Sequence, residues 1–259
     1  MFEMIDIHAH ILPGLDDGPE TVEQSLEMAR AFVKAGYTAV IATPHVIPGV
    51  YDHTRAAILR SVRRFQERLQ AAGIPLTVLP GAEYHVSDQL LSLFRAGELL
   101  TLNDTGKYLL VELPFYQLPE HLSQVLFELL LAGVTPIIAH PERNDLLARH
   151  PGALTEMCRK GVLAQVTAGS LTGLFGSQTK RAAAHFIKEE TAQFVATDAH
   201  DPGRRLEAGS EVARLLEAKA QLLMDKHPTA VINGAALEAA ACREAAPARS
   251  RWLNFPGRR

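Results

Sequence analysis

The sequence predicts an α/β fold in which parallel strands and helices alternate around a barrel. Short apolar runs of β type alternate with segments of helical period, giving about seven βα units without an internal linker. Residues 134–139 form a nearly continuous apolar run, which is typical of a strand covered on both faces. Residues that commonly bind metals directly follow several of these runs. Because the carboxyl ends of the strands of a parallel barrel meet at one mouth, such residues become neighbours.

The strands are predicted from short apolar runs, most of them three to six residues long. The first run starts at Met4 and ends in the sequence Asp6-Ile7-His8-Ala9-His10. The other strands are expected at residues 39–43, 76–79, 109–111, 134–139 and 193–197.

The helices are predicted from their apolar period and from glycine stop signals. Thr21 can cap a helix that runs to residue 35, and Gly36 follows as its stop signal. Residues 54–72 are expected to form a second helix, because Gly73 and Pro75 follow. Further helices are expected at residues 120–132, 153–160, 177–189 and 207–226.

Composition limits the class of protein. The chain has 259 residues and a net charge of −3, which argues against a nucleic-acid-binding surface. No apolar run is long enough to insert into a membrane, and no export signal is visible, so a cytoplasmic location is expected. Two cysteines form neither a disulfide framework nor a zinc site. Residues 1–245 are predicted to form a single domain, and residues 246–259 an irregular C-terminal tail.

Nine candidate metal ligands form the main functional signal. They are His8, His10, Asp17, His45, Glu83, Glu112, His140, Asp198 and His200. His8 and His10 lie two apart at a strand end, so both imidazoles point the same way. A lone exposed histidine is usually a solvated surface residue, but the shared position after strands favours metal binding for the whole set.

Two aspartates near the first strand need separate interpretation. Asp6 lies on the same face as His8 and His10 but deeper, so we expect it to orient a metal-bound imidazole. Asp16 and Asp17 precede Gly18, where an ordinary Asx-turn is also possible for both carboxylates.

Five imidazoles and four carboxylates are too many for one ion and suit two or three bridged ions. Because no cysteine is included, the set fits manganese, iron or zinc. Such ions would attract a phosphate dianion and lower the pKa of bound water. Arg143 follows His140 closely, and Arg204-Arg205 follow His200. Arginine can bind a phosphoryl group in a bidentate manner, although a surface loop is the ordinary alternative.

Six short motifs of the chain resemble those of the polymerase-and-histidinol-phosphatase (PHP) superfamily. The motifs are Asp-Ile-His-Ala-His, Leu-Asp-Asp-Gly-Pro, Thr-Pro-His, Gly-Ala-Glu, His-Pro-Glu-Arg and Thr-Asp-Ala-His. Within it, the chain most resembles the bacterial manganese-dependent protein-tyrosine phosphatases of capsule and exopolysaccharide operons. Asp16-Asp17-Gly18-Pro19 and the run from Ala168 to Gly176 carry this closer likeness.

The resemblance implies a distorted (β/α)7 TIM-like barrel with three divalent ions, manganese first among the metals. His8, His10, Glu83 and Asp198 would hold the first ion, Glu83, Glu112 and His140 the second, and Asp17, His45 and His200 the third. Arg143 and Arg205 match arginines that engage the substrate phosphate. The implied partner is a phosphotyrosine-containing protein, namely an autophosphorylated bacterial tyrosine kinase that controls polysaccharide synthesis.

The expected reaction is hydrolysis of a phosphotyrosine monoester, in which a metal-bridging hydroxide attacks phosphorus in line. A cysteine-dependent phosphatase is excluded, because Ala164 and Ala248 stand where an arginine would have to follow Cys158 and Cys242. A small-molecule phosphatase, such as a histidinol-phosphatase, would use the same metals with a different pocket. Metal-dependent amide hydrolysis gives the arginines no role. A non-catalytic, metal-stabilised regulatory module is a rival from another class, but the complete ligand set argues against it.

Overall fold

The computed structural model describes residues 2–237, which contain nine strands in two sheets. The strands are β1 (Met4–Ala9), β2 (Tyr37–Ala42), β3 (His45–Val46), β4 (Thr77–Pro80), β5 (Glu83–His85), β6 (Tyr108–Glu112), β7 (Thr135–Ala139), β8 (Leu163–Thr167) and β9 (Phe194–Ala196). One sheet has the order β1-β2-β4 and the other β3-β5-β6-β7-β8-β9, with every pairing parallel. The predicted tail, residues 246–259, lies outside the described residues.

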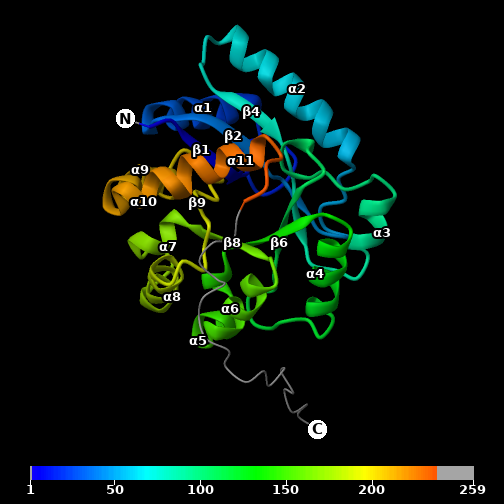
Figure 1. The fold of residues 1–259 in the computed structure, drawn as a ribbon. Coiled ribbons are helices and arrows are strands. Elements are labelled where there is room, and N and C mark those ends of the chain that lie inside the picture. Colours follow the sequence, from blue (N-terminus) through cyan, green and yellow to red (C-terminus); the bar gives the residue numbers. More distant parts are fainter. Residues whose placement is uncertain (1, 238–259) are drawn as a thin grey trace.

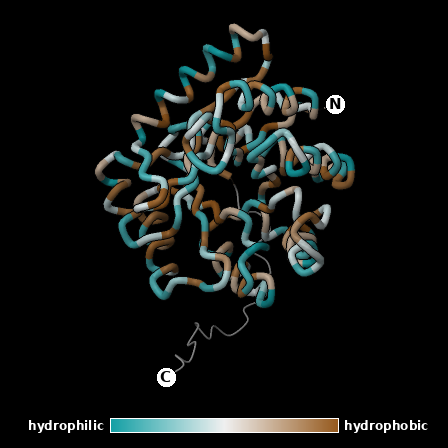
Figure 2. Tube along the Cα trace, turned by 180° about the vertical axis from the view of Figure 1, so that it is seen from behind, coloured by the Kyte–Doolittle hydropathy of each residue, from teal (hydrophilic) through white to brown (hydrophobic). Residues whose placement is uncertain are grey.

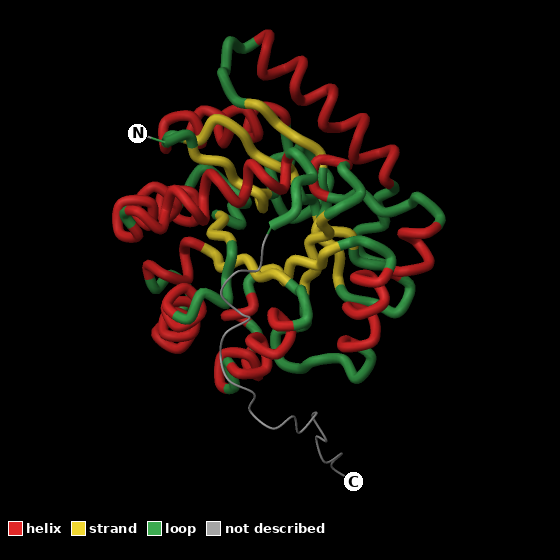
Figure 3. The backbone as a smooth tube through the Cα atoms, in the orientation of Figure 1, coloured by secondary structure: helices red, strands yellow, loops and turns green. Residues whose placement is uncertain are grey.

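The nine strands form seven barrel positions, because two positions are interrupted. Thr43 and Pro44 interrupt one strand between β2 and β3, and Gly81 and Ala82 interrupt the other between β4 and β5. A side chain at position 81 would meet Cγ2 of Ile41 at 2.6 Å, so only glycine fits this approach. The barrel closes through a parallel bridge between Ala9 and Ala199. Figure 3 shows the resulting ring of strands inside the helices. The predicted distorted (β/α)7 barrel is confirmed.

Helices surround this ring (Figure 1). They are α1 (Val22–Ala35), α2 (Arg55–Ala71), α3 (Leu90–Arg95), α4 (Leu122–Leu131), α5 (Asp145–Arg149), α6 (Gly152–Arg159), α7 (Ala168–Thr172), α8 (Ser177–Lys188), α9 (Arg204–Leu216), α10 (Ala218–Gln221) and α11 (His227–Ile232). The short turns η1 (Leu102–Asp104) and η2 (Pro141–Arg143) and the π-helical η3 (Leu222–Lys226) complete the set. Among the described residues, no helix combines the length and the apolar character needed to span a membrane.

The boundaries of α1 follow the predicted signals. The side chain of Thr21 accepts a hydrogen bond from the backbone nitrogen of Gln24, whose own side chain returns a bond to the Thr21 backbone. Gly36 ends the helix with φ of 95°, a left-handed conformation that glycine adopts easily. Helices α2, α4, α6 and α8 also lie within two residues of their predicted ranges.

The single helix predicted for residues 207–226 is wrong. The helix α9 starts earlier, at Arg204, and ends at Leu216, and Glu217 then turns the chain with φ of 49°. The chain continues through α10 and η3, and η3 contacts β1 and β9. This turn buries Leu223 and Met224 against the barrel. Because no glycine or proline marks Glu217, the sequence carries no signal for the break, and tertiary packing decides it.

The barrel interior is filled by apolar side chains and closed at one end. The interior cluster includes Ile7, Ile41, Tyr108, Leu110, Ile137, Leu163, Phe194 and Val231. Val231 lies on α11, and the backbone oxygen of Ile232 accepts a hydrogen bond from Asn103 at 2.9 Å. The larger cluster packs between the strands and the outer helices, and Figure 2 shows hydrophobic segments along the central strands. With the interior filled, the open mouth at the carboxyl ends of the strands is left for a site.

Candidate metal centre

All nine predicted ligands lie at the carboxyl ends of barrel strands or in the loops that follow them. His8, His10 and Asp17 belong to β1 and its loop, Glu112 ends β6, His140 follows β7, and Asp198 and His200 follow β9. His45 and Glu83 begin β3 and β5, the short second segments that follow β2 and β4 at the carboxyl ends of the two interrupted positions. They form four overlapping groups, in each of which the ligand atoms lie within 4.8 Å of one another. The groups are His8, His10 and Asp198; His8, Glu83 and His140; His45, Glu83 and Glu112; and His10, Asp17, His45 and His200.

His8 and His10 direct one ring nitrogen each to a common point. Their Nε2 atoms lie 3.3 Å apart, and Oδ1 of Asp198 is 3.5 Å from both. The opposite nitrogen of each ring has a partner outside the cluster. Nδ1 of His8 lies 2.8 Å from Oε1 of Gln165, and Nδ1 of His10 lies 2.6 Å from Oδ2 of Asp16. Because these oxygens accept the Nδ1 hydrogen, Nε2 is the nitrogen of each ring that a cation would bind once it displaces the Nε2 proton.

Sequence reasoning missed the roles of Gln165 and Asp16. Gln165 is a fully buried polar residue inside β8, and that burial is a signal only once the strand has been placed. Asp16 forms the Asx-turn to the backbone of Gly18 considered from the sequence, and it also contacts His10. Its Oδ2 further accepts a hydrogen bond from the backbone nitrogen of His45 at 3.0 Å. Asp16 therefore links two ligand-bearing segments.

Glu83 lies fully buried among three imidazoles. Its Oε2 is 2.9 Å from Nδ1 of His45 and 3.3 Å from Nε2 of His8, and its Oε1 is 3.1 Å from Nε2 of His140. Within the described residues, neither Oε2 nor Nδ1 of His45 has a hydrogen bond of proper geometry. Burial of a polar atom without a hydrogen-bond partner destabilises the fold, and a cation bound by both atoms would supply the missing partner. The nitrogen and oxygen donors present fit divalent ions.

The charges of the centre depend strongly on one another. Burial lowers the pKa of His8, but Glu83 and Asp198 outweigh it and raise that pKa to about 9. Burial raises the pKa of Glu83 and of Asp198, but the surrounding histidines, with His8 first among them, lower both. A hydrogen bond from His200 lowers the pKa of Asp17 to about 2. Glu83, Asp198 and Asp17 are therefore ionised at neutral pH, and protons on the neighbouring histidines balance them when no cation does.

Two ligand positions carry unusual backbone conformations. His140 has φ of 31° and Asp198 has φ of 52°, both in the left-handed region. Such conformations persist where the surrounding structure holds them, and they are common at functional sites. The buried Glu142 holds the segment after His140, because its Oε1 accepts hydrogen bonds from the backbone nitrogen of Thr167 at 2.8 Å and from Oγ of Ser170 at 2.7 Å.

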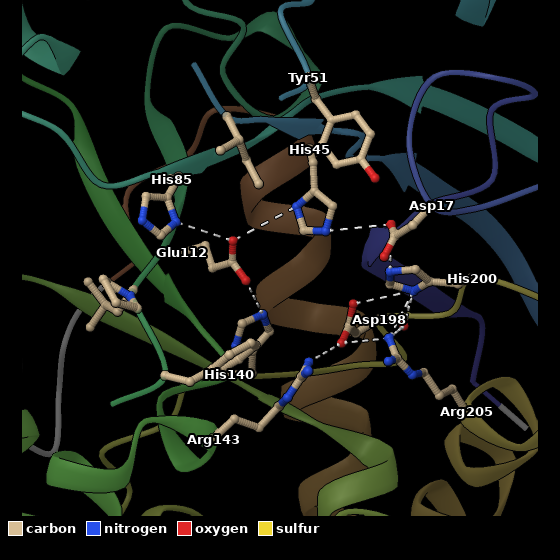
Figure 4. A pocket seen from close by; sticks show the side chains of 14 residues that line it. Asp17, His45, Tyr51, His85, Glu112, His140, Arg143, Asp198, His200 and Arg205 are labelled. Carbon is tan, nitrogen blue, oxygen red and sulfur yellow. Dashed lines mark hydrogen bonds and ion pairs between the residues drawn. The ribbon is translucent and has the colours of Figure 1, made fainter. Parts of the chain in front are cut away.

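A cavity of about 390 Å³ opens above the centre (Figure 4). Ligand side chains form part of its wall, together with Tyr51, His85 and Phe115, none of which was singled out from the sequence. The ring of Tyr51 stacks on His45 with the ring centroids 5.9 Å apart. Nδ1 of His85 lies 3.5 Å from Oε2 of Glu112. The metal centre is therefore reached through a partly aromatic mouth.

The two arginines singled out from the sequence meet at this mouth. Nη1 of Arg143 donates to Oδ2 of Asp198 at 2.8 Å, and Nη1 of Arg205 donates to the same oxygen at 3.1 Å. Both guanidinium groups line the cavity, and Figure 4 shows one on each side of Asp198. Arg204, the neighbour of Arg205, is exposed and does not line the cavity.

Asp6 does not orient an imidazole, contrary to the prediction. Its carboxylate accepts hydrogen bonds from the backbone nitrogen of His8 at 3.0 Å and from the backbone nitrogen and hydroxyl of Thr197. Asp6 was predicted to share a face with His8 and His10 because side chains alternate along a strand. Asp6 lies farther from the mouth than these histidines, however, and its carboxylate lies beside the backbone of β1 and of the segment after β9. Asp6 therefore ties together two strand ends that carry ligands.

The barrel and its convergent nitrogen and oxygen donors define a metal-binding α/β barrel protein. A profile of the family described as capsular polysaccharide synthesis, CpsB/CapC, matches residues 4–228. The chain therefore belongs to the CpsB/CapC family.

Similar proteins agree with this assignment. The chain is 40% identical over 233 residues to the tyrosine-protein phosphatase YwqE of Bacillus subtilis (strain 168), which covers 85% of this chain and 91% of the relative. Crystal structures of YwqE from Bacillus subtilis and CpsB from Streptococcus pneumoniae, described as unique metal-dependent tyrosine phosphatases, include a match with a TM-score of 0.84 and 37% identity, covering 90% of this chain and 96% of that chain. A histidinol phosphate phosphatase from Lactococcus lactis has a TM-score of 0.56 at 14% identity, covering 85% of this chain and 94% of that chain, and shows the fold alone.

Proposed function

We propose that this chain, a metal-dependent tyrosine-protein phosphatase of the capsular polysaccharide synthesis type, hydrolyses phosphotyrosine on an autophosphorylated bacterial tyrosine kinase. The observation that carries the proposal is the convergence of four metal-ligand groups and two arginines at one mouth. The family membership and the likeness to YwqE support the same activity. That the phosphotyrosine lies on a kinase is proposed in addition, from the resemblance of the chain to its family.

We further propose that the nine ligands hold three divalent ions, with manganese as the preferred metal. The presence of Glu83 in two groups supports a carboxylate that bridges two ions. The set proposed for the third ion, Asp17, His45 and His200, falls within a single group together with His10. When bound, such ions lower the pKa of water and withdraw charge from a phosphoryl group.

The chain's own residues bind and orient the substrate. Arg143 and Arg205 would engage the phosphoryl oxygens that develop charge, because both guanidinium groups line the cavity and are fixed by Asp198. Phe115 and the neighbouring Tyr116 are 38% and 84% exposed, so apolar surface is available beside the mouth for the segment that carries the phosphotyrosine. A tyrosine phenolate is a fairly good leaving group, so the demand for a general acid is modest.

A substrate panel tests this proposal. Manganese-loaded protein is assayed with a phosphotyrosine peptide, a phosphoserine peptide and histidinol phosphate at equal concentrations. We expect kcat/KM to be highest for the phosphotyrosine peptide. A preference for histidinol phosphate would instead identify a small-molecule phosphatase, and no turnover of any substrate would favour a non-catalytic regulatory module.

Two further parts of the proposal need experiments in cells. The kinase assignment predicts that deletion of this protein raises tyrosine phosphorylation of the kinase, and that Glu83→Ala fails to reverse the rise. The expected cytoplasmic location stays a prediction, which fractionation of cells that express the protein would test.

A further inference from the structure

We propose that Phe175 is a positioning residue that holds Arg143 and Arg205 ready for the substrate phosphate. The proposal rests on the proposed function, because it assumes that both arginines bind that phosphate. Phe175 lies in the segment between α7 and α8, within the run 168–176. The proposed chemistry gives this run no other role.

One aromatic ring contacts both guanidinium groups. Cζ of Arg143 lies 4.9 Å from the centroid of the Phe175 ring, and Cζ of Arg205 lies 5.3 Å from it. Arg143 also lies over Phe115, with Cζ 4.8 Å from that centroid. All three distances are within the range of cation–π attraction, about 6 Å. Phe175 is the aromatic residue that these contacts have in common.

The two arginines need such support because their positive charges repel each other. Both donate to Oδ2 of Asp198, so two like charges lie close together. Nη1 of Arg205 also donates to the backbone oxygen of Asp198 at 2.7 Å. The single negative charge of Asp198 still cannot offset two guanidinium charges fully, whereas the negative face of an aromatic ring attracts each of them. A side chain that is already held in place also loses less conformational entropy when phosphate binds. Phe175 would therefore improve phosphate binding without touching the phosphate.

The segment around Phe175 is built for close packing. A side chain at position 169 would place its Cβ 3.1 Å from Cε2 of Phe175 and 3.1 Å from Cδ2 of Leu174, so glycine at 169 leaves room for both. The backbone nitrogen of Leu174 donates to the oxygen of Gly169 at 2.8 Å, and Gly173 takes the left-handed turn with φ of 93°. The ring is therefore held by its own loop.

A buried hydrogen bond fixes this loop relative to Arg143. Oγ of Ser170 donates to Oε1 of Glu142 at 2.7 Å, and Glu142 directly precedes Arg143 in η2. The ring and the guanidinium group thus belong to two segments joined by a buried contact. Phe115 lines the cavity, whereas Phe175 is not among the lining residues. Phe175 therefore contacts the arginines without forming part of the cavity wall.

The test compares Phe175→Leu with Phe175→Tyr in the full-length, manganese-loaded protein. Leucine keeps an apolar side chain but removes the ring face, while tyrosine keeps it. We expect Phe175→Leu to lower kcat/KM for a phosphotyrosine peptide by about 10-fold and to raise the inhibition constant of inorganic phosphate by a similar factor. Metal content and Tm should stay unchanged, and Phe175→Tyr should behave like the wild type. Phe127→Leu, a ring loss at an exposed position on α4, is the matched control and should change nothing.

The same substitution in an Arg143→Ala/Arg205→Ala background separates this proposal from the proposed function. If Phe175 acts through the arginines, Phe175→Leu has no further effect in that background. An equal, additive loss there, or a loss of metal in Phe175→Leu alone, would overturn the positioning role. Unchanged kinetics in Phe175→Leu would overturn it as well, while the arginine variants remained impaired. If the arginine variants themselves kept full kcat/KM and phosphate inhibition, the phosphate-binding role of the arginines would be wrong.

Discussion

Nη1 of Arg143 lies 2.8 Å from Oδ2 of Asp198, while Oδ1 of the same carboxylate lies 3.5 Å from Nε2 of His8. Asp198 thus has one oxygen directed to the metal centre and the other to the arginines. Its backbone lies in the left-handed region, with φ of 52°, a conformation that persists only where the surrounding structure holds it. A single carboxylate therefore couples the place where cations are expected to the place where a phosphate is expected.

This coupling allows a test of the two arginines. Replacement of Arg143 or Arg205 by Ala should lower kcat/KM for a phosphotyrosine peptide by roughly 30- to 1000-fold, because a charge-assisted contact in a partly dry site is lost. Metal content should stay unchanged, since the remaining arginine still bonds Asp198. Lysine should rescue only partly, because it keeps the charge but lacks the planar fork. Metal analysis and steady-state kinetics on the same preparation check both points, and a loss of metal in Arg143→Ala would show a structural role instead.

The outer partners of the histidines should control metal affinity. Gln165→Leu removes the oxygen that accepts the Nδ1 hydrogen of His8, and Asp16→Ala removes the corresponding oxygen for His10. Each variant should bind manganese about 10- to 100-fold more weakly, in line with the loss of comparable partners elsewhere. Gln178→Leu, a similar change at an exposed position on α8, serves as the control. Equal manganese affinity in all four proteins would show that the imidazoles need no outer partner.

Metal binding should release protons. The carboxylates around His8 raise its pKa to about 9, and the pKa of His10 is raised as well. A raised pKa means that the metal-free protein holds these protons at pH 7, so a cation must displace them, and manganese affinity should fall as the pH falls. Calorimetric titration at pH 7 in two buffers of different protonation enthalpy measures the release. Identical binding enthalpies in the two buffers would be incompatible with it.

Much of the fold and site follows from local signals in the sequence. The cap at Thr21 and the stop at Gly36 define α1 because they act within one helical turn. The nine ligands could be proposed without a structure because parallel strands deliver their carboxyl ends to one mouth. The break at Glu217 could not be predicted, since it depends on how η3 packs against β1 and β9.

The outer residues of the site escaped prediction for a similar reason. Gln165 contacts His8 across 157 positions of sequence, and an amide in a strand carries no metal-binding signal by itself. Asp6 was expected to orient an imidazole, but it accepts hydrogen bonds from the backbone nitrogens of His8 and Thr197. The second of these bonds depends on the register between strands that are distant in the sequence. The role proposed for Phe175 depends on the position of its ring beside two arginines, which no local pattern in the sequence indicates.

Glu83 offers the sharpest test among the ligands. Glu83→Ala removes a carboxylate that contacts three imidazoles and belongs to two ligand groups. We expect activity to fall by at least about 100-fold and metal content to decrease. Fold and solubility should survive, because the site lies at the barrel mouth, and circular dichroism checks this. Near-normal turnover by a folded Glu83→Ala protein would contradict the proposal that Glu83 bridges two ions.

The central claim is that phosphotyrosine hydrolysis depends on ions held by these nine residues. The most direct measurement is hydrolysis of a phosphotyrosine peptide by chelator-treated protein during titration with manganese, with elemental analysis at each point. We predict negligible activity in the metal-free protein and a rise that saturates when about three ions are bound per chain, the content proposed for the nine ligands. Full activity in protein that contains less than about one ion per ten chains would contradict the claim.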